Sequence, residues 1–147
     1  MKIAGFFLDG YYCLDNYSPF QFVWKGKMYS TVEHAYQAAH FFKTNPDLSE
    51  KIRLCFSPVE AFELANKNSQ YDDPKWKNIR VTIMEEILRA KLKQNNFVRD
   101  ILINTGNKII VEKNKKDSFW GWGPDHKGQN NLGKIWMKLR DELSVKK

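Results

Sequence analysis

Residues 76–92, WKNIRVTIMEEILRAKL, form the stretch that most clearly predicts the fold. At about 100° per residue, the apolar side chains occupy one broad arc and most polar side chains the opposite arc. Asp73-Pro74 is a helix start signal, and the pattern continues to about Gln94. The stretch therefore predicts a long amphipathic helix.

Two basic residues of this helix, Arg80 and Lys91, fall near the middle of the apolar arc, where a charge is costly. One explanation is structural: both stems lie along apolar surface while the charged ends reach water or a carboxylate. The other is a cleft in which Arg80 binds an anion and a desolvated Lys91 attacks an opened sugar aldehyde as a neutral amine. The sequence leaves both explanations open.

Start and stop signals place the other elements around this helix. Ser30-Thr31-Val32-Glu33 is a capping box, in which Glu33 has the structural task of bonding back to the start of the helix. The expected strands are at 3–8 and 108–112, with a hairpin at 20–29 that turns at Lys25-Gly26. The expected helices are at 30–43, 73–94, 97–105 and 132–143, and a further helix starts at Ser57-Pro58. Asn130 or Asn131 caps the helix at 132–143. Helices dominate, with a few short strands beside them.

Length and composition fit one folded domain spanning residues 1–147, with 42% hydrophobic and 14% aromatic residues. No apolar run approaches the ~20 residues that cross a bilayer, and the first residues do not resemble a secretory signal peptide. Cys13 and Cys55 lack metal-ligand spacing, so we expect reduced thiols, a cytoplasmic protein and no metal. The net charge of +7 suits a phosphorylated ligand or nucleic acid, although surface lysines that keep the protein soluble explain it equally well.

Two carboxylates lie beside a glycine-rich loop in the C-terminal third of the chain. Glu112 ends an apolar strand, and Asp117 precedes residues 118–123, where two tryptophans alternate with glycines. Residues 128–133 then lead into a helix N-terminus, which favours phosphate. Stacking tryptophans, free amides and carboxylates together suggest a nucleotide or sugar-phosphate pocket. Core tryptophans and an ordinary capped helix are the alternative.

Several motifs in a fixed order resemble the NADAR family, named for a proposed link to NAD and ADP-ribose, over nearly the whole chain. The most specific are Thr31-Val32-Glu33-His34-Ala35-Tyr36-Gln37-Ala38, Asp117 with Phe119-Trp120-Gly121, and Gly128 with Asn130 and Leu132-Gly133; Asn16-Tyr17-Ser18-Pro19-Phe20, Ala90-Lys91-Leu92 and Val111-Glu112 accompany them. YbiA-type members of this family are N-glycosidases. The resemblance implies an α+β, predominantly helical fold and cleavage of an N-glycosidic bond by water, without metal or cofactor.

The resemblance implies two substrate types. One is ADP-ribose attached through nitrogen, including on guanine bases of nucleic acid; the other is a phosphorylated ribosylamino-pyrimidine of riboflavin synthesis. It also implies that Glu33 and Lys91 lie in the pocket. We assign carboxylate roles to Glu33 and Asp117, with Glu112 in support, and a Schiff-base or charge-partner role to Lys91. Ligand-binding roles fall to Trp120 and Trp76 by stacking, and to Asn16, Tyr17, Arg80, Gly121 and Asn130 by polar contacts.

The chain departs from the family pattern at one position. Family members often have a lysine where this chain has His40, and Lys43 follows one turn later. We interpret the change as altered substrate specificity. A module that binds ADP-ribose or single-stranded nucleic acid without chemistry is the alternative from another functional class.

Overall fold

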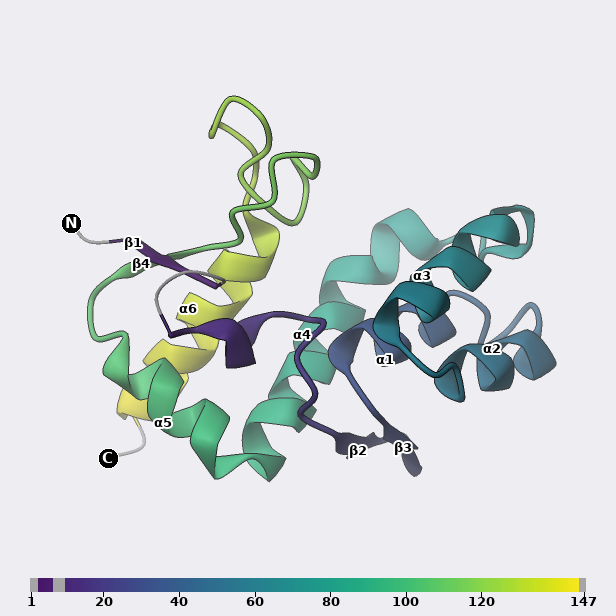
Figure 1. Ribbon diagram of the computed structural model, residues 1–147, viewed down its shortest axis with the longest axis horizontal. Helices are drawn as coiled ribbons and strands as arrows, with labels where there is room; N and C mark the ends of the chain where they lie inside the picture. Colours follow the sequence, from purple (N-terminus) through teal and green to yellow (C-terminus); the bar gives the residue numbers. More distant parts are fainter. Residues whose placement is uncertain (1–2, 7–9, 146–147) are drawn as a thin grey trace. The chain divides into compact units, whose positions relative to one another are not determined.

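The computed structural model of the protein describes residues 3–6 and 10–145 (Figure 1). Its contacts divide the chain into two compact units. One unit comprises residues 16–94, and the other combines the residues up to Asp15 with those from Asn95 onward. Each unit has its own strands, helices and buried side chains.

The 16–94 unit begins with the predicted hairpin. Strands β2 (Phe22–Trp24) and β3 (Lys27–Tyr29) pair antiparallel, with Trp24 opposite Lys27. Lys25 and Gly26 have φ values of 51° and 79°, as a two-residue hairpin turn requires. The expected turn at Lys25-Gly26 is confirmed.

Helix α1 (Val32–Ala39) follows, and all of its residues are buried. The predicted cap was wrong in detail: Thr31, not Ser30, is the N-cap, and its side chain accepts a hydrogen bond from the backbone N–H of His34. Thr31 has extended backbone angles, so the helix begins one residue later than expected. It also ends at Ala39 rather than near Lys43, because the chain tightens into i→i−3 hydrogen bonds after Gln37.

Helices α2 (Pro46–Arg53) and α3 (Pro58–Lys67) pack against α1. The cap at Ser57 confirms the predicted start of α3, because the Ser57 side chain accepts from the backbone N–H of Glu60. The sequence analysis missed α2, although Asn45-Pro46 supplies a cap and a first-turn proline. A short 3-10 helix, η2 (Ser69–Tyr71), leads to α4.

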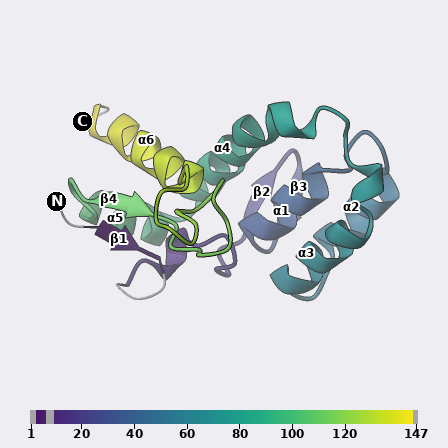
Figure 2. The ribbon, with the colours of Figure 1, turned by 90° about the horizontal axis from the view of Figure 1, so that it is seen from above.

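Helix α4 (Trp76–Gln94) confirms the long predicted helix. It packs on α1 and β2, so that α1 lies between α4 on one side and α2 and α3 on the other (Figure 2). At its end, the Gln94 side chain accepts from the N–H of Val23 at 2.7 Å and donates to the Val23 carbonyl at 2.8 Å. This double hydrogen bond fixes β2 to the C-terminal end of α4.

The other unit contains β1 (Ile3–Gly5), η1 (Tyr12–Leu14), α5 (Asn96–Asn104), β4 (Ile109–Val111) and α6 (Asn131–Val145). Strands β1 and β4 pair in parallel, with Ala4 opposite Ile110. The strand expected at 3–8 is observed at Ile3–Gly5, and positions 7 and 8 lie outside the described residues. The predictions of α5, β4 and α6 are confirmed to within a few residues.

Side chains of α6 hold this unit together. The buried Trp136 donates its indole N–H to the Leu14 carbonyl at 3.0 Å. Arg140 donates to the Thr105 hydroxyl at 2.9 Å and to the Lys108 carbonyl at 2.8 Å. These bonds tie α6 to η1, to the end of α5 and to the approach to β4.

The α+β, predominantly helical architecture with short strands is confirmed. The prediction of one domain over residues 1–147 stays a prediction. Among the described residues, no helix has the length and apolarity needed to cross a membrane.

Candidate active site

Lys91 is completely buried, with 0% of its surface exposed, on the face of α4 that also buries Met84, Ile87 and Leu88. Its Nζ donates a hydrogen bond to the Ser18 hydroxyl at 3.0 Å and lies 5.6 Å from the centre of the Phe20 ring. The structural explanation in which the amine reaches water is therefore wrong for Lys91. The amine is held inside the unit by a hydroxyl and an aromatic ring.

The loop that carries Ser18 contacts both α1 and α4. The Asn16 carbonyl accepts from the backbone N–H of Glu33 at 3.1 Å, and the Asn16 side-chain amide lies 3.8 Å from the sulfur of Met84. The amide oxygen of Asn16 is buried and has no hydrogen-bond partner among the described residues. The ligand-binding role of Asn16 stays a prediction, as does that of Tyr17, which lies half-buried beside it.

Glu33 lies in the first turn of α1 with only 7% of its surface exposed. Its carboxylate accepts from the Gln37 amide at 2.7 Å, rather than from the Ser30 backbone as the capping box predicted. Its place in the first turn of α1 puts this carboxylate at the end of the helix where acidic side chains are favoured. Glu33 is thus linked through Asn16 to the loop that binds the Lys91 amine.

A cluster of rings lies where α1 ends and α4 begins. The buried Trp76 has its ring 3.8 Å from the His40 ring and 5.2 Å from the Tyr36 ring, measured between centroids. The packing of Trp76 on two protein rings offers a structural reason for its presence, and its stacking on substrate stays a prediction. Arg80 lies half-buried one turn further along α4.

The His40 ring contacts both Trp76 and Tyr36. Its Nδ1 lies 3.1 Å from an Asp72 carboxylate oxygen. Burial lowers the pKa of His40, with Asp72 opposing the effect and Arg80 adding to it, so the imidazole is mainly neutral at neutral pH. Lys43 lies beyond the end of α1 and is exposed.

The remaining predicted residues belong to the other unit. Glu112 is buried at the end of β4, and its backbone N–H donates to the Asn130 side-chain oxygen at 2.9 Å. The Asn130 amide donates in turn to the Ile110 carbonyl at 2.9 Å. Both ends of the Asn130 side chain therefore clamp the loop to the backbone of β4, and its ligand-binding role stays a prediction.

Asp117 organises the tryptophan loop. One of its carboxylate oxygens accepts from the backbone N–H groups of Phe119 and Trp120 at 2.9 and 2.8 Å. Trp120 is half-buried, with its ring edge-on to Phe119. A side chain at Gly121 would approach the Glu112 carbonyl to 2.7 Å, so only glycine lets the loop pass β4 this closely. The catalytic role of Asp117 stays a prediction beside this turn-forming role.

Three residues that the sequence analysis gave no role contact the predicted ones: Ser18, Gln37 and Asp72. Ser18 could have been noted, because it belongs to the Asn16–Phe20 motif. Gln37 follows Glu33 by four residues, a helical spacing that brings two side chains together. Asp72 carries no sequence signal, since it lies 32 residues from His40.

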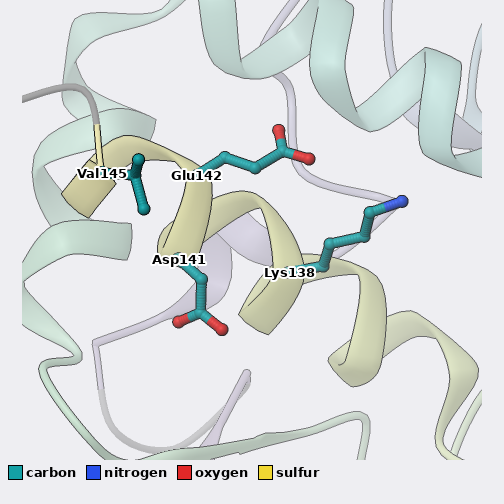
Figure 3. A pocket seen from close by; sticks show the side chains of 4 residues that line it. All are labelled: Lys138, Asp141, Glu142 and Val145. Atoms are coloured by element: carbon teal, nitrogen blue, oxygen red, sulfur yellow. The ribbon is translucent and has the colours of Figure 1, made fainter.

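A surface depression of about 590 Å³ lies against α6, lined by Lys138, Asp141, Glu142 and Val145 (Figure 3). None of the predicted site residues lines it. Among the described residues, no group of three or more His, Cys, Asp or Glu side chains is arranged to hold a metal ion. The arrangement around Lys91 and Glu33 is therefore the best-built candidate site.

The NADAR domain family model matches residues 6–144. The chain belongs to the NADAR family.

Individual relatives agree with this membership. The chain is 32% identical over 139 residues to the N-glycosidase YbiA of Escherichia coli, covering 95% of this chain and 86% of that protein. It is 36% identical over 130 residues to a riboflavin biosynthesis protein of Vibrio vulnificus, covering 88% of this chain but only 35% of that protein. The solved NMR structure of E. coli YbiA superposes with a TM-score of 0.88 at 31% identity, covering 99% of this chain and 86% of that chain.

Proposed function

We propose that this protein is an N-glycosidase that hydrolyses a ribose–nitrogen bond, and that ADP-ribose linked through nitrogen, for example to guanine in nucleic acid, is its main substrate. The observation that carries the proposal is the fully buried Lys91 amine bonded to Ser18. A buried lysine destabilises a fold, and such groups are characteristic of chemical sites. The net charge of +7 favours an anionic substrate.

In the proposed chemistry, the neutral Lys91 amine attacks the anomeric carbon. The new carbon–nitrogen bond replaces the bond to the base, and the departing base nitrogen gains the proton that the amine loses. The ring oxygen then separates from the anomeric carbon and takes a proton from solvent, leaving an iminium cation on Lys91; one proton returns to solvent when this cation is hydrolysed. Water adds to this carbon and the amine leaves, so the net reaction consumes one water.

Glu33 supports these steps as a carboxylate. The anomeric carbon becomes positively charged as the base departs, and a buried anion stabilises that charge or activates the attacking water. The alternative role of Lys91 is that of a charge partner that keeps such a carboxylate ionised. Catalytic roles of Asp117 and Glu112 are part of the proposal, and variants of Asp117 test its role.

A second substrate, a phosphorylated ribosylamino-pyrimidine, is favoured by the name of the Vibrio relative, a riboflavin biosynthesis protein. Both substrates contain a ribose–nitrogen bond, so the same residues serve either reaction. We also propose a cytosolic location, which the free cysteines Cys13 and Cys55 support.

The test incubates the protein with a guanine-linked ADP-ribosyl oligonucleotide and, separately, with the phosphorylated ribosylamino-pyrimidine. Products are followed by mass spectrometry, with Lys91→Ala beside each reaction. Release of ADP-ribose supports the first substrate, and release of ribose phosphate supports the second. Salt-dependent binding without any product would instead favour a binding module. Borohydride reduction during turnover should add the sugar mass to Lys91 if the covalent route operates.

A further inference from the structure

His40 and Asp72 form a pair that fixes the hydrogen positions of an imidazole. The Asp72 carboxylate accepts hydrogen bonds, so the His40 Nδ1 that lies 3.1 Å from it carries the hydrogen. In the neutral ring, Nε2 is then the acceptor. A lysine at this position would present only donors, so His40 changes the kind of hydrogen bond that the site offers.

The acceptor atom is unused within the protein. Nε2 of His40 is buried and has no hydrogen-bond partner among the described residues. Buried acceptors without partners destabilise a fold and are rare unless something else satisfies them. Since 14% of the His40 side chain stays exposed, the ring lies at the edge of the packed cluster rather than deep in the core.

The neighbours hold the ring in one orientation. Trp76 packs on it with 3.8 Å between centroids and 31° between planes, and Tyr36 meets it edge-on at 5.3 Å. The backbone N–H of Asp73 donates to the His40 carbonyl at 3.0 Å, which fixes the end of α1 to the segment that carries Asp72. These contacts fix the orientation of the His40 ring, and so the direction in which its Nε2 accepts a hydrogen bond.

Glu33, in the first turn of α1, and His40, the residue that follows α1, lie on the same face of the helix. Glu33, Gln37 and His40 are spaced by four and three residues, so they follow one another on the same helical face. Seven residues of helix separate Glu33 from His40 by roughly 10 Å along the axis. This span is comparable to the length of a nucleoside phosphate.

We propose that His40, oriented by Asp72, is a specificity-determining residue whose Nε2 accepts a hydrogen bond from a hydroxyl or amino group at the end of the substrate away from Glu33. The assignment rests on the proposed function for the substrate class. Asp72 is then a positioning residue of the site, and His40 selects substrates that carry a hydrogen-bond donor at this end.

Nitrogen NMR of the histidine rings tests the contact directly. The chain has three histidines, and the other two serve as internal controls: both ring nitrogens of His34 lie within hydrogen-bond distance of protein oxygens, and His126 is exposed. In the free protein we expect His40 to be neutral with its hydrogen on Nδ1. Ribose 5-phosphate, which offers hydroxyls, and 5,6-diaminouracil, which offers amino groups, are then added separately. We expect one of them to shift the His40 Nε2 signal while the His34 signals stay unchanged.

Two variants test the role in turnover. His40→Phe keeps an aromatic ring on Trp76 but removes Nε2, and we expect KM to rise roughly tenfold, the effect of one lost hydrogen bond, with a smaller change in kcat. Asp72→Asn permits the other tautomer, so KM should rise by a smaller factor, and the NMR signals should show hydrogen on Nε2. His40→Gln, which supplies an acceptor without a ring, should recover part of the loss.

The outcomes separate this inference from the proposed function. Turnover by wild type with no shift of Nε2 by either probe, or an unchanged KM in His40→Phe, overturns the role of His40 and leaves the N-glycosidase intact. A shift of Nε2 without turnover of either substrate supports the His40 contact and counts against the enzyme. Hydrogen on Nε2 in the free protein would also overturn the inference, because Asp72 would then not orient the ring.

Discussion

Lys91 Nζ and Ser18 Oγ lie 3.0 Å apart, and both residues are completely buried. A serine hydroxyl accepts a hydrogen bond from an ammonium group and also donates one to the lone pair of a neutral amine. Ser18 is therefore able to hold the lysine in either protonation state. A Schiff-base mechanism requires both states, because the amine must lose a proton to attack and gain one to leave.

Replacing Ser18 tests whether the hydroxyl positions the amine. We expect Ser18→Ala to fold, to lose about 1–2 kcal/mol of unfolding free energy and to turn over roughly tenfold more slowly. Ser18→Thr retains the hydroxyl and should recover more of the rate than of the stability, because its added methyl group has to be packed. Turnover and denaturant unfolding are measured on both variants. Full activity in Ser18→Ala would remove Ser18 from the mechanism.

Replacing Lys91 separates its chemistry from its packing. Lys91→Met keeps the length of the side chain and removes the buried polar amine, so unfolding free energy should stay within about 1 kcal/mol of wild type or rise. Turnover should fall at least about a thousandfold, as it does when a nucleophile is lost. The exposed Lys77 on the same helix provides the matched control, Lys77→Met, which should change neither quantity appreciably. A stable and active Lys91→Met variant would contradict the proposed reaction.

Glu33→Gln is the corresponding test of the carboxylate. The amide keeps an oxygen that accepts from Gln37, so the hydrogen bond and the helix start are preserved. We expect a change in stability below about 1 kcal/mol and a fall in kcat of roughly a hundredfold or more. Circular dichroism and kinetics on the same preparation distinguish the two effects. A rate loss that merely follows unfolding would assign Glu33 to structure alone.

Local signals in the sequence predicted most of the secondary structure. The periodic pattern of residues 76–92, the Lys25-Gly26 turn and the Ser57 cap each depend on residues close together in the chain, and each is confirmed. The α1 cap was misplaced because Ser30 and Thr31 are adjacent and both suited to capping, and only the backbone angles of Thr31 decide between them. The short helix α2 was missed because it has few apolar residues.

The contacts of the candidate site depend on pairs that are distant in the chain. Ser18 and Lys91 are 73 residues apart, and His40 and Asp72 are 32 apart. The position of Lys91 on the apolar arc placed its side-chain stem against apolar surface, because helical periodicity is a local property, but left open whether the amine reaches water. No local rule predicts that a serine hydroxyl meets the amine or that an aspartate orients the imidazole. Those relationships follow from the packing of the 16–20 loop and the 72–76 segment.

Asp117 offers a matched pair of variants for its two roles. Its side-chain oxygen accepts from the N–H groups of Phe119 and Trp120, and asparagine preserves an oxygen at the same place. Asp117→Asn should therefore keep the loop and lose the carboxylate, whereas Asp117→Ala loses both and should cost about 1–2 kcal/mol. If Asp117 is catalytic, kcat falls roughly a hundredfold in both variants. Full turnover in Asp117→Asn would show that the residue only shapes the loop.

A surface ion-pair network in the 16–94 unit gives stability a specific dependence on pH. Glu50 bonds to Arg53 and to Lys27, with the Lys27 pair at 3.0 Å, and Arg53 also donates to the Met28 carbonyl. The network thus joins α2 to β3. Hydrogen bonds from Arg53 and then Lys27 lower the pKa of Glu50 from 4.5 to about 2.

Because folding lowers the pKa of Glu50, the unfolded chain binds a proton at this carboxylate before the native protein does. The contribution of Glu50 is therefore complete above pH 4.5 and is lost as the pH falls toward about 2. The Glu50 side chain is 37% exposed, so solvent screening limits the contribution to about 1 kcal/mol or less. Unfolding free energies measured from pH 7 to 2 should show wild type more stable than Glu50→Gln at pH 7, with the difference shrinking below pH 4.5. High salt should reduce the stability difference between wild type and Glu50→Gln at every pH. A difference that stays constant down to pH 2 would mean that Glu50 stabilises the hairpin and α2 by packing rather than by its charge.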